Sequence, residues 1–492
     1  MDILQSSYLI KFINKIDLSD ISKVDNSVKN SLFSKLLTIP IEIFHPLISR
    51  FTESSLFAKN IDYLILANLL ILLIAITFSS TAILGILAAT LLLLTIIKWF
   101  IIPGEKHNFT TFDIPIAAYI LIALISVAFS SYFMPSLKGL AKLLVYFAIY
   151  VIGTNIFKGK SWKLYFILIV ISLTGGFEAL YGIYQKLSGV EALATWQDPD
   201  AIKAGRKMSR VYGSIIPFNP NLLAGYLLAI FPCAFGLGSI FALKKRWHWS
   251  ILFTGLSLAA LACIVFTGSR GAYIGVAAMG LSTYLFAGHI IWKDLSEHKF
   301  SKYFKWGWLL AGAGAIAVIL MGLMFMPALQ DRILSIFTLR GNSSNSFRMN
   351  VYLSCLEMFK DNWLIGIGIG NTTFRLIYGF YMTTGFDALG AYSVPLEVAV
   401  EMGIIGLLVF IWMFIVFFSN ALKTFASSKS IEIKLLIATI FTAIVGMSGQ
   451  GIFDTIWYRP QVHMIFWLLI AILACIVSRK VIFSDSEQDN EP

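Results

Sequence analysis

Long apolar runs recur along the whole chain and leave few folds open to it. Of the 492 residues, 58% are hydrophobic and only 13% are charged, whereas about a quarter of a soluble domain is charged. Many runs reach roughly 18 to 22 residues, which is long enough to cross the hydrocarbon as a helix. The runs are continuously apolar rather than alternating, which excludes a membrane β-barrel. The sequence therefore predicts an all-α, polytopic transmembrane helix bundle.

About twelve spans are expected, in a membrane domain at residues 60–480. An N-terminal extension at residues 1–59 mixes apolar and charged residues, so it predicts either an amphipathic helix on the inner leaflet or a disordered tail. Residues 481–492 form an acidic tail. The expected spans are Ile61–Phe78, Ala82–Ile102, Ile114–Phe133, Gly139–Ile156, Leu164–Tyr184, Asn221–Leu243, Ile251–Phe266, Ala272–Ile291, Trp306–Phe325, Pro395–Phe418, Leu435–Ile452 and Val462–Val477.

The positions of the basic residues predict the orientation. If the N-terminus is cytoplasmic, every predicted cytoplasmic loop carries Lys or Arg, as the positive-inside rule requires. The short loops on the opposite side carry only three basic residues, Lys138, Arg270 and Arg459. We therefore expect a protein of the inner or plasma membrane with both termini in the cytoplasm. The net charge of +11 then serves topology and contact with membrane lipid rather than nucleic acid.

Four segments that lie far apart in the sequence are predicted to share the outer face. They are the hairpin around Arg270, the loop 185–214, the large outer loop 326–393 and the turn Asp454–Arg459. An arginine at the edge of the hydrocarbon is costly unless it is paired, hydrated or turned inward. Arg270 is therefore either a binding residue or a snorkelling anchor of a helix end. We expect the functional site where these segments meet.

The large outer loop is expected to contain a short amphipathic helix, Phe347–Lys360, with Ser346 as its cap. Arg348 would lie in the first turn, where the helix dipole disfavours a cation. A carboxylate such as Asp361 or Glu357, or a bound phosphate, would remove that conflict.

The glycine-rich stretch Ile365–Asn371 follows this predicted helix. It lacks the preceding strand and the glycine spacing of a dinucleotide site. It predicts a tight, closely packed turn instead.

Polar residues at the predicted helix ends supply further candidates. Asn219 and Asn221 either cap the sixth span or bind a sugar or phosphate. Asp454 and Arg459 either pair locally or belong to the site. The six histidines show no clustered spacing, so we expect neither a metal nor a cofactor.

Glu397 and Glu401 stand in an apolar run. A carboxylate at that depth needs a partner, and either Arg270, Arg348 or a proton could serve.

Several of these motifs together resemble a known family. Ser269-Arg270-Gly271, Phe347-Arg348-Met349, Gly366-Ile367-Gly368 and Glu401-Met402-Gly403-Ile404-Ile405-Gly406 are similar, in this order, to the O-antigen ligase and polymerase superfamily. Phe218–Tyr226, Ala391-Tyr392-Ser393 and Asp454–Val462 resemble its IctB-like branch, whose members are labelled as inorganic-carbon (bicarbonate) transporters of photosynthetic bacteria.

The resemblance implies transfer of a polyprenyl-diphosphate-linked glycan to an acceptor at the outer face. Arg270 and Arg348 match arginines that hold the diphosphate, but Tyr392 stands where the ligases have a histidine base. A tyrosine with a pKa near 10 is a poor base at neutral pH. Either a carboxylate replaces the histidine, or this branch has lost the chemistry. The carboxylates that could do so are Glu401, Glu397, Asp387 and Asp454.

Two main functions therefore stay open, a glycosyltransferase or ligase and a bicarbonate transporter, with a non-catalytic scaffold as a third. The sequence shows no repeated pair of broken helices of the kind found in transporters. We expect catalytic roles for Arg270, Arg348 and Glu401. We expect substrate-binding roles for Asn219, Asn221, Ser269, Tyr392, Asp454 and Arg459.

Overall fold

The computed structural model describes residues 55–102, 105, 107–189, 209–325, 327–336, 343–456 and 459–483, together with Ile39 and Ile43. Most of the predicted N-terminal extension and of the acidic tail lies outside these ranges. In chain order the elements are α5 (Leu56–Ala75), α6 (Thr81–Ile101), α7 (Asp113–Ala128), α8 (Phe133–Phe157), β1 (Gly159–Lys160), α9 (Trp162–Ser188), α11 (Pro220–Leu243), α12 (Trp247–Thr267), α13 (Arg270–His289), η1 (Ile290–Asp294), α14 (Ser301–Phe325), α15 (Pro327–Leu334), α16 (Ser343–Asp361), α17 (Asn371–Tyr378), α18 (Val394–Ser427), α19 (Ile431–Gly451), α20 (Pro460–Val477) and β2 (Val481–Ile482).

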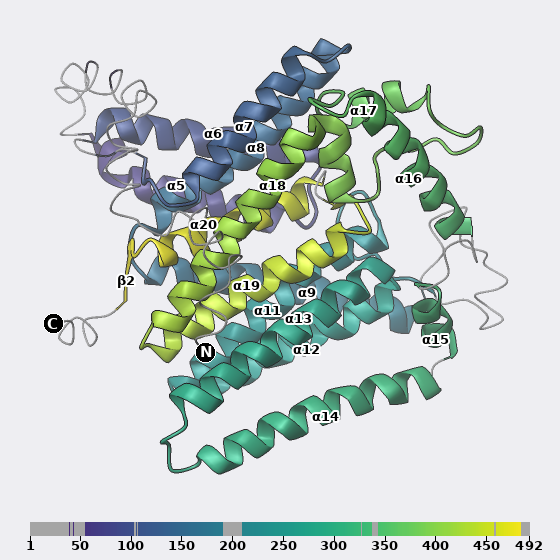
Figure 1. The fold of residues 1–492 in the computed structure, drawn as a ribbon. Coiled ribbons are helices and arrows are strands. Elements are labelled where there is room, and N and C mark those ends of the chain that lie inside the picture. The colour runs from purple at the N-terminus through teal and green to yellow at the C-terminus, as the bar shows by residue number, and fades with distance from the viewer. Residues whose placement is uncertain are drawn as a thin grey trace, which may run out of the picture.

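The predicted helix bundle is confirmed. Eleven of the described helices are long and apolar enough to cross a membrane, and α7 is apolar but has only 16 residues. These twelve helices match the twelve expected spans in order, although their ends differ. The largest shift is at α18, which ends at Ser427 rather than at Phe418. Every residue of α20 is buried, so this helix forms the centre of the bundle (Figure 1).

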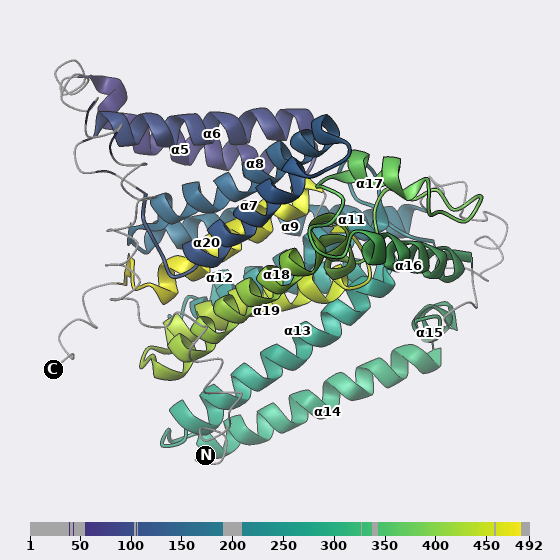
Figure 2. The ribbon, with the colours of Figure 1, turned by 45° about the horizontal axis from the view of Figure 1, so that its top comes forward.

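The two ends of the bundle are built differently. The short helices α15, α16 and α17 gather at one end, whereas β2 lies at the other (Figures 1 and 2). There β2 pairs in parallel with β1, which follows α8. The large loop predicted for the outer face therefore occupies the end opposite to β2.

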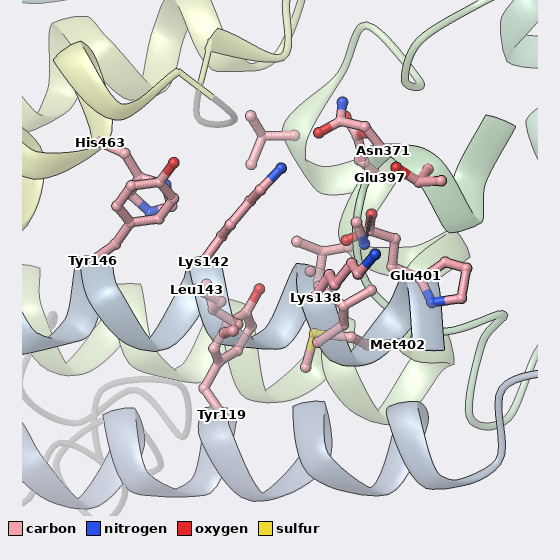
Figure 3. Close-up of a pocket in the computed structure, with 18 of the residues that line it drawn as sticks. Tyr119, Lys138, Lys142, Leu143, Tyr146, Asn371, Glu397, Glu401, Met402 and His463 are labelled. Atoms are coloured by element: carbon pink, nitrogen blue, oxygen red, sulfur yellow. Dashed lines mark hydrogen bonds between the residues drawn. The ribbon is translucent and has the colours of Figure 1, made fainter. Parts of the chain in front are cut away.

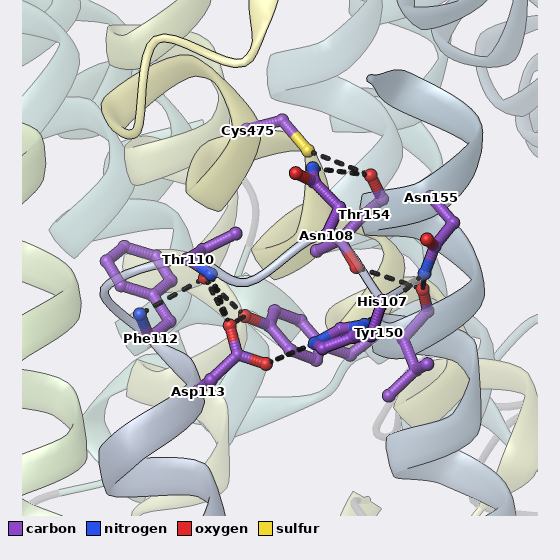
Figure 4. A network of polar contacts seen from close by, with 10 residues as sticks. His107, Asn108, Thr110, Phe112, Asp113, Tyr150, Thr154, Asn155 and Cys475 are labelled. Carbon is purple, nitrogen blue, oxygen red and sulfur yellow. Dashed lines mark hydrogen bonds and ion pairs between the residues drawn. The ribbon is translucent and has the colours of Figure 1, made fainter. Parts of the chain in front are cut away.

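A polar network fixes the start of α7 at the end that carries β2. Asp113 accepts hydrogen bonds from the Thr110 backbone N–H at 2.6 Å and from the Tyr150 hydroxyl at 3.1 Å. Its other carboxylate oxygen lies 2.6 Å from His107 Nε2. The Asn108 amide donates to the Thr154 carbonyl at 2.9 Å (Figure 4). The network ties the loop before α7 to α8.

α14 lies at the edge of the molecule and none of its described residues is buried (Figure 2). It is held to α13 by Trp308, whose ring stacks on Tyr284 with centroids 4.3 Å apart. The Trp308 indole N–H also donates to the Tyr284 carbonyl at 3.0 Å. A helix with an apolar surface on all sides and so few protein contacts belongs in lipid.

α18 is broken at Gly403, where the backbone adopts φ 67° and ψ −169°. The glycine turn of residues 364–370 packs into the break. A Cβ at Gly403 would lie 2.3 Å from the Leu364 carbonyl oxygen, and one at Gly366 would lie 2.3 Å from the Glu401 carbonyl carbon. Backbone hydrogen bonds then join Ile367 to Val400 at 3.0 Å. The predicted tight, closely packed turn is confirmed, and only glycine fits at its two closest approaches.

Candidate functional site

Arg270 stands at a hairpin, as predicted. α12 ends at Thr267, Gly268 follows in the left-handed conformation, and α13 begins at Arg270. Only 7% of Arg270 is exposed. Its guanidinium donates to the Ser344 hydroxyl at 3.0 Å and to the Ser335 hydroxyl at 3.3 Å. The side chain therefore points toward α15 and α16 instead of snorkelling away from them.

Arg348 lies on α16, which begins at Ser343. The predicted cap at Ser346 is therefore wrong, since Ser346 lies inside the helix, and Arg348 is one turn further from the N-terminus than expected. Its partner is Asp454, with Arg348 Nη2 3.5 Å from Asp454 Oδ2. The expected carboxylates Glu357 and Asp361 do not take this place, and Asp361 accepts from the Tyr381 hydroxyl instead.

Asp454 connects two segments that are far apart in the sequence. Its Oδ2 accepts a hydrogen bond from the Asn221 amide at 2.8 Å. The Asn221 side-chain oxygen Oδ1 accepts from Arg210 at 2.6 Å. Asn219 caps α11, because its side chain accepts from the Asn221 backbone N–H. Among the described residues Asp454 forms no ion pair with Arg459, so the local clamp is not formed.

Two further arginines, which the sequence motifs do not indicate, lie at the hairpin that carries Arg270. Arg210 Nε donates to the Thr267 carbonyl at 2.7 Å, and Arg332 Nε donates to the Gly268 carbonyl at 2.8 Å. Both therefore satisfy carbonyls at the negative end of α12. We call Arg210, Arg270, Arg332 and Arg348 the arginine cluster. Their positions in the sequence could have indicated them. Arg210 lies in the loop 185–214 and Arg332 in the large outer loop 326–393, and both loops were predicted to face outward.

The electrostatics of the cluster favour an added anion. Burial and the nearby Arg332 lower the pKa of Arg210 to about 9. Burial also lowers the pKa of Arg332, and Arg348 adds to that effect. Asp454 is the one carboxylate that contacts the cluster in the described part of the chain, and burial raises its pKa although Arg348 lowers it. In the described residues, the four arginines thus outnumber the one carboxylate near them. A bound anion would stabilise the charged forms of these arginines.

Tyr392 borders the cluster on a strained loop. Its φ is 52°, its ring centroid lies 5.8 Å from the Arg348 guanidinium carbon, and its ring meets Phe347 edge to face at 5.6 Å. Burial raises the pKa of its phenol. We call residues 390–393 the Tyr392 loop. A Cβ at Gly390 would lie 2.6 Å from Glu397 Oε1, so Glu397 packs against this loop.

The remaining candidates lie around this centre. Glu401 accepts a hydrogen bond from the Gly370 N–H at 2.8 Å and lines a separate cavity. Asp387 forms an exposed ion pair with Arg375 at 2.6 Å. Ser269 is buried directly before Arg270, and the Arg459 carbonyl begins α20 by accepting from the His463 N–H.

The structure thus brings together Arg270, Arg348, Asn221, Tyr392 and Asp454. It does not bring Asp387 to them. Within the described ranges, no group of three or more His, Cys, Asp or Glu side chains could hold a metal ion.

Comparison with known proteins relates part of this architecture to a family. Residues 255–411 match the family model described as O-antigen ligase. The match runs from α12 to α18, so it includes Arg270, Arg332, Arg348, Tyr392 and Glu401. None of the curated proteins matches the chain.

Proposed function

We propose that this O-antigen ligase-like membrane protein binds a polyprenyl-diphosphate-linked glycan at its arginine cluster. The protein then transfers this glycan to an acceptor at the outer face of the cell membrane. The observation that carries the proposal is that four arginines from four separate segments lie together, while among the described residues only one carboxylate, Asp454, contacts any of them. Such an excess of buried cations fits a ligand with several negative oxygens.

The four arginines divide into two pairs by their contacts. Arg210 and Arg332 are fixed on the carbonyls of Thr267 and Gly268, so they hold the hairpin and add positive potential. Arg270 contacts two serine hydroxyls, and Arg348 contacts Asp454 at the long distance of 3.5 Å. These weaker contacts leave Arg270 and Arg348 able to turn toward a diphosphate.

Transfer requires one bond to break and one to form. The acceptor hydroxyl oxygen bonds to the anomeric carbon of the glycan, and the bond from that carbon to the diphosphate breaks. Positive side chains stabilise the charge that develops on the departing diphosphate. The hydroxyl proton passes to a base, and the raised pKa of Tyr392 makes this phenol unsuited to the task.

Two carboxylates flank the Tyr392 loop and replace histidine in this proposal. Asp454 contacts the arginine cluster through Arg348, and burial raises the pKa of its carboxyl although Arg348 lowers it. Glu397 packs against Gly390. Asp387 is excluded from this role because it forms an exposed pair with Arg375.

Bicarbonate transport, the function implied by the IctB-like resemblance, is the second candidate. The break in α18 at Gly403 favours it, because interrupted helices form ion sites in transporters. In that case the arginine cluster would attract bicarbonate to the outer face.

Envelope glycan analysis of a deletion strain, paired with bicarbonate uptake by proteoliposomes, tests the two functions. The strain would be complemented with the parent protein, Arg270→Ala or Arg375→Ala. The Arg375 variant is the matched control because it removes an exposed outer arginine outside the cluster.

We expect a lipid-linked glycan to accumulate in the deletion strain and in the Arg270 variant, but not in the Arg375 control. Glycan profiles that are identical in all four strains, together with uptake by proteoliposomes holding only this protein, would overturn the transferase proposal in favour of transport.

A further inference from the structure

A cavity of about 410 Å³ is lined mainly by residues of α8 and α18. Its charged lining comes from Lys138 and Lys142 of α8 and from Glu397 and Glu401 of α18. None of the four cluster arginines is among the described residues that line it. Figure 3 shows these side chains around one space, with His463 and Tyr146 closing one end. The cavity is therefore a separate site from the cluster.

One wall of the cavity offers two ammonium groups. Lys138 and Lys142 are four residues apart on α8 and so lie on one face of the helix. Both reach into the cavity (Figure 3). In the part of the chain that the structure describes, neither ammonium forms an ion pair or a hydrogen bond. A lysine inside a membrane-spanning helix is costly and is a binding-site candidate by default. This wall fits an anion.

The facing wall offers acceptors and apolar surface. Glu397 and Glu401 are also four residues apart, on α18, and Asn371 lies beside them. Carboxylate and amide oxygens accept hydrogen bonds from hydroxyl groups. Leu143 and Met402 add apolar lining at the floor. A ligand that satisfies both walls carries a negative charge and hydroxyl groups on an apolar body.

One residue that lines the cavity, Glu397, also contacts the Tyr392 loop. Glu397 packs against Gly390, where an added Cβ would lie 2.6 Å from the carboxylate oxygen. Two residues further on, the Tyr392 ring lies against Arg348 at 5.8 Å. The Tyr392 loop therefore contacts both Glu397 of the cavity and Arg348 of the cluster.

We infer that this cavity binds the headgroup of an anionic, hydroxyl-bearing membrane lipid. Lys138 and Lys142 bind the negative headgroup charge. Glu397 and Glu401 bind the hydroxyls, and the chains of the lipid leave toward the bilayer. This inference does not rest on the proposed function.

Lipid binding to the purified full-length protein tests the inference. Native mass spectrometry would compare phosphatidylglycerol, which has a phosphate and hydroxyls, with phosphatidylcholine, which has no hydroxyl and no net charge. The variants would be Lys138→Gln/Lys142→Gln, its conservative partner Lys138→Arg/Lys142→Arg, and Arg270→Ala. Lys360→Gln is the matched control, because Lys360 is exposed at the end of α16 and outside the cavity.

The parent is expected to prefer phosphatidylglycerol. The double glutamine variant should bind it roughly tenfold or more weakly, the loss expected for charge-assisted contacts. The double arginine variant, Lys360→Gln and Arg270→Ala should keep the preference. Retention in the arginine pair would show that charge, rather than local unfolding, explains the loss.

Three results would overturn the inference. The first is equal binding of phosphatidylglycerol by the double glutamine variant. The second is its loss in Arg270→Ala, which would make the cavity part of the arginine site. The third is equally strong binding of glycerol phosphate, which would identify a site for free phosphate rather than lipid.

The outcome also separates the two proposals. Unchanged envelope glycans with intact lipid binding would refute the proposed transfer and leave the lipid site standing.

Discussion

Replacing Arg270 with alanine separates a binding role from a structural one. In the described residues Arg270 pairs with no carboxylate, and it donates only to Ser335 and Ser344. Breaking a buried ion pair would cost about 3–5 kcal/mol. Losing these hydrogen bonds costs roughly 1–3 kcal/mol, and removal of one of four like charges offsets much of that. The free energy of unfolding without ligand should therefore change little.

Ligand binding should respond much more strongly than stability. Loss of charge-assisted hydrogen bonds to a diphosphate costs about 1.5–3 kcal/mol, which weakens binding by roughly 10- to 150-fold. Geranylgeranyl diphosphate is a suitable short-chain probe, and the corresponding alcohol is its uncharged control. At about 100 times the Kd, the ligand stabilises the parent by roughly 2.7 kcal/mol. A variant with hundredfold weaker binding would lose most of that stabilisation.

Thermal unfolding of the detergent-solubilised protein measures both quantities. Parent, Arg270→Ala and Arg375→Ala would each be melted with and without the probe. We expect equal melting temperatures without ligand, and a ligand-induced rise in the parent and the Arg375 control alone. A variant that is several kcal/mol less stable without ligand, yet keeps the full ligand-induced rise, would show that Arg270 is structural.

Three further predictions concern the break, the cluster and the opposite end of the bundle. Gly403→Ala places a Cβ 2.3 Å from the Leu364 carbonyl oxygen at a residue with φ 67°. This should lower the free energy of unfolding by at least about 1–2 kcal/mol. An unchanged melting temperature would contradict the close packing. Burial raises the pKa of Asp454 in the folded protein. Its contribution to stability is therefore present below about pH 4, which is its pKa in the unfolded chain, and is lost as the pH rises through the folded pKa. Asp454→Asn should remove this decline when melting temperatures are measured over a series of pH values. Lys434, 2% exposed, pairs with Asp294 at 2.6 Å, so Lys434→Met should cost about 3–5 kcal/mol, and adding Asp294→Leu should restore part of it in a double-mutant cycle.

The helices were predictable because the length and continuity of an apolar run reflect the thickness of the membrane. Their ends were not, since side-chain contacts decide them. α16 starts at Ser343 although Ser343–Ser346 reads as a turn, and Arg270 reaches the Ser344 hydroxyl there. The break at Gly403 lies inside a run that is hydrophobic on both sides, so hydropathy gives no sign of it.

The meeting of Arg270 and Arg348 was predictable from topology alone, because both lie in segments expected at one face. Arg210 and Arg332 were missed because their partners are backbone carbonyls, which leave no mark on the pattern of side chains. The lysine wall was also missed. Its signal was Lys142, a charge inside the predicted span Gly139–Ile156.

The peripheral position of α14 links the bilayer to the chemistry at the surface. α15 follows this lipid-facing helix in the chain and carries Arg332 of the arginine cluster, and Ser335, which contacts Arg270, comes directly after α15. A helix adapts to a thinner or thicker membrane by changing its tilt, and α14 is fastened mainly near its start, at Trp308. Its far end would then swing most. Affinity for an anion at the cluster should therefore vary with acyl-chain length in reconstituted vesicles.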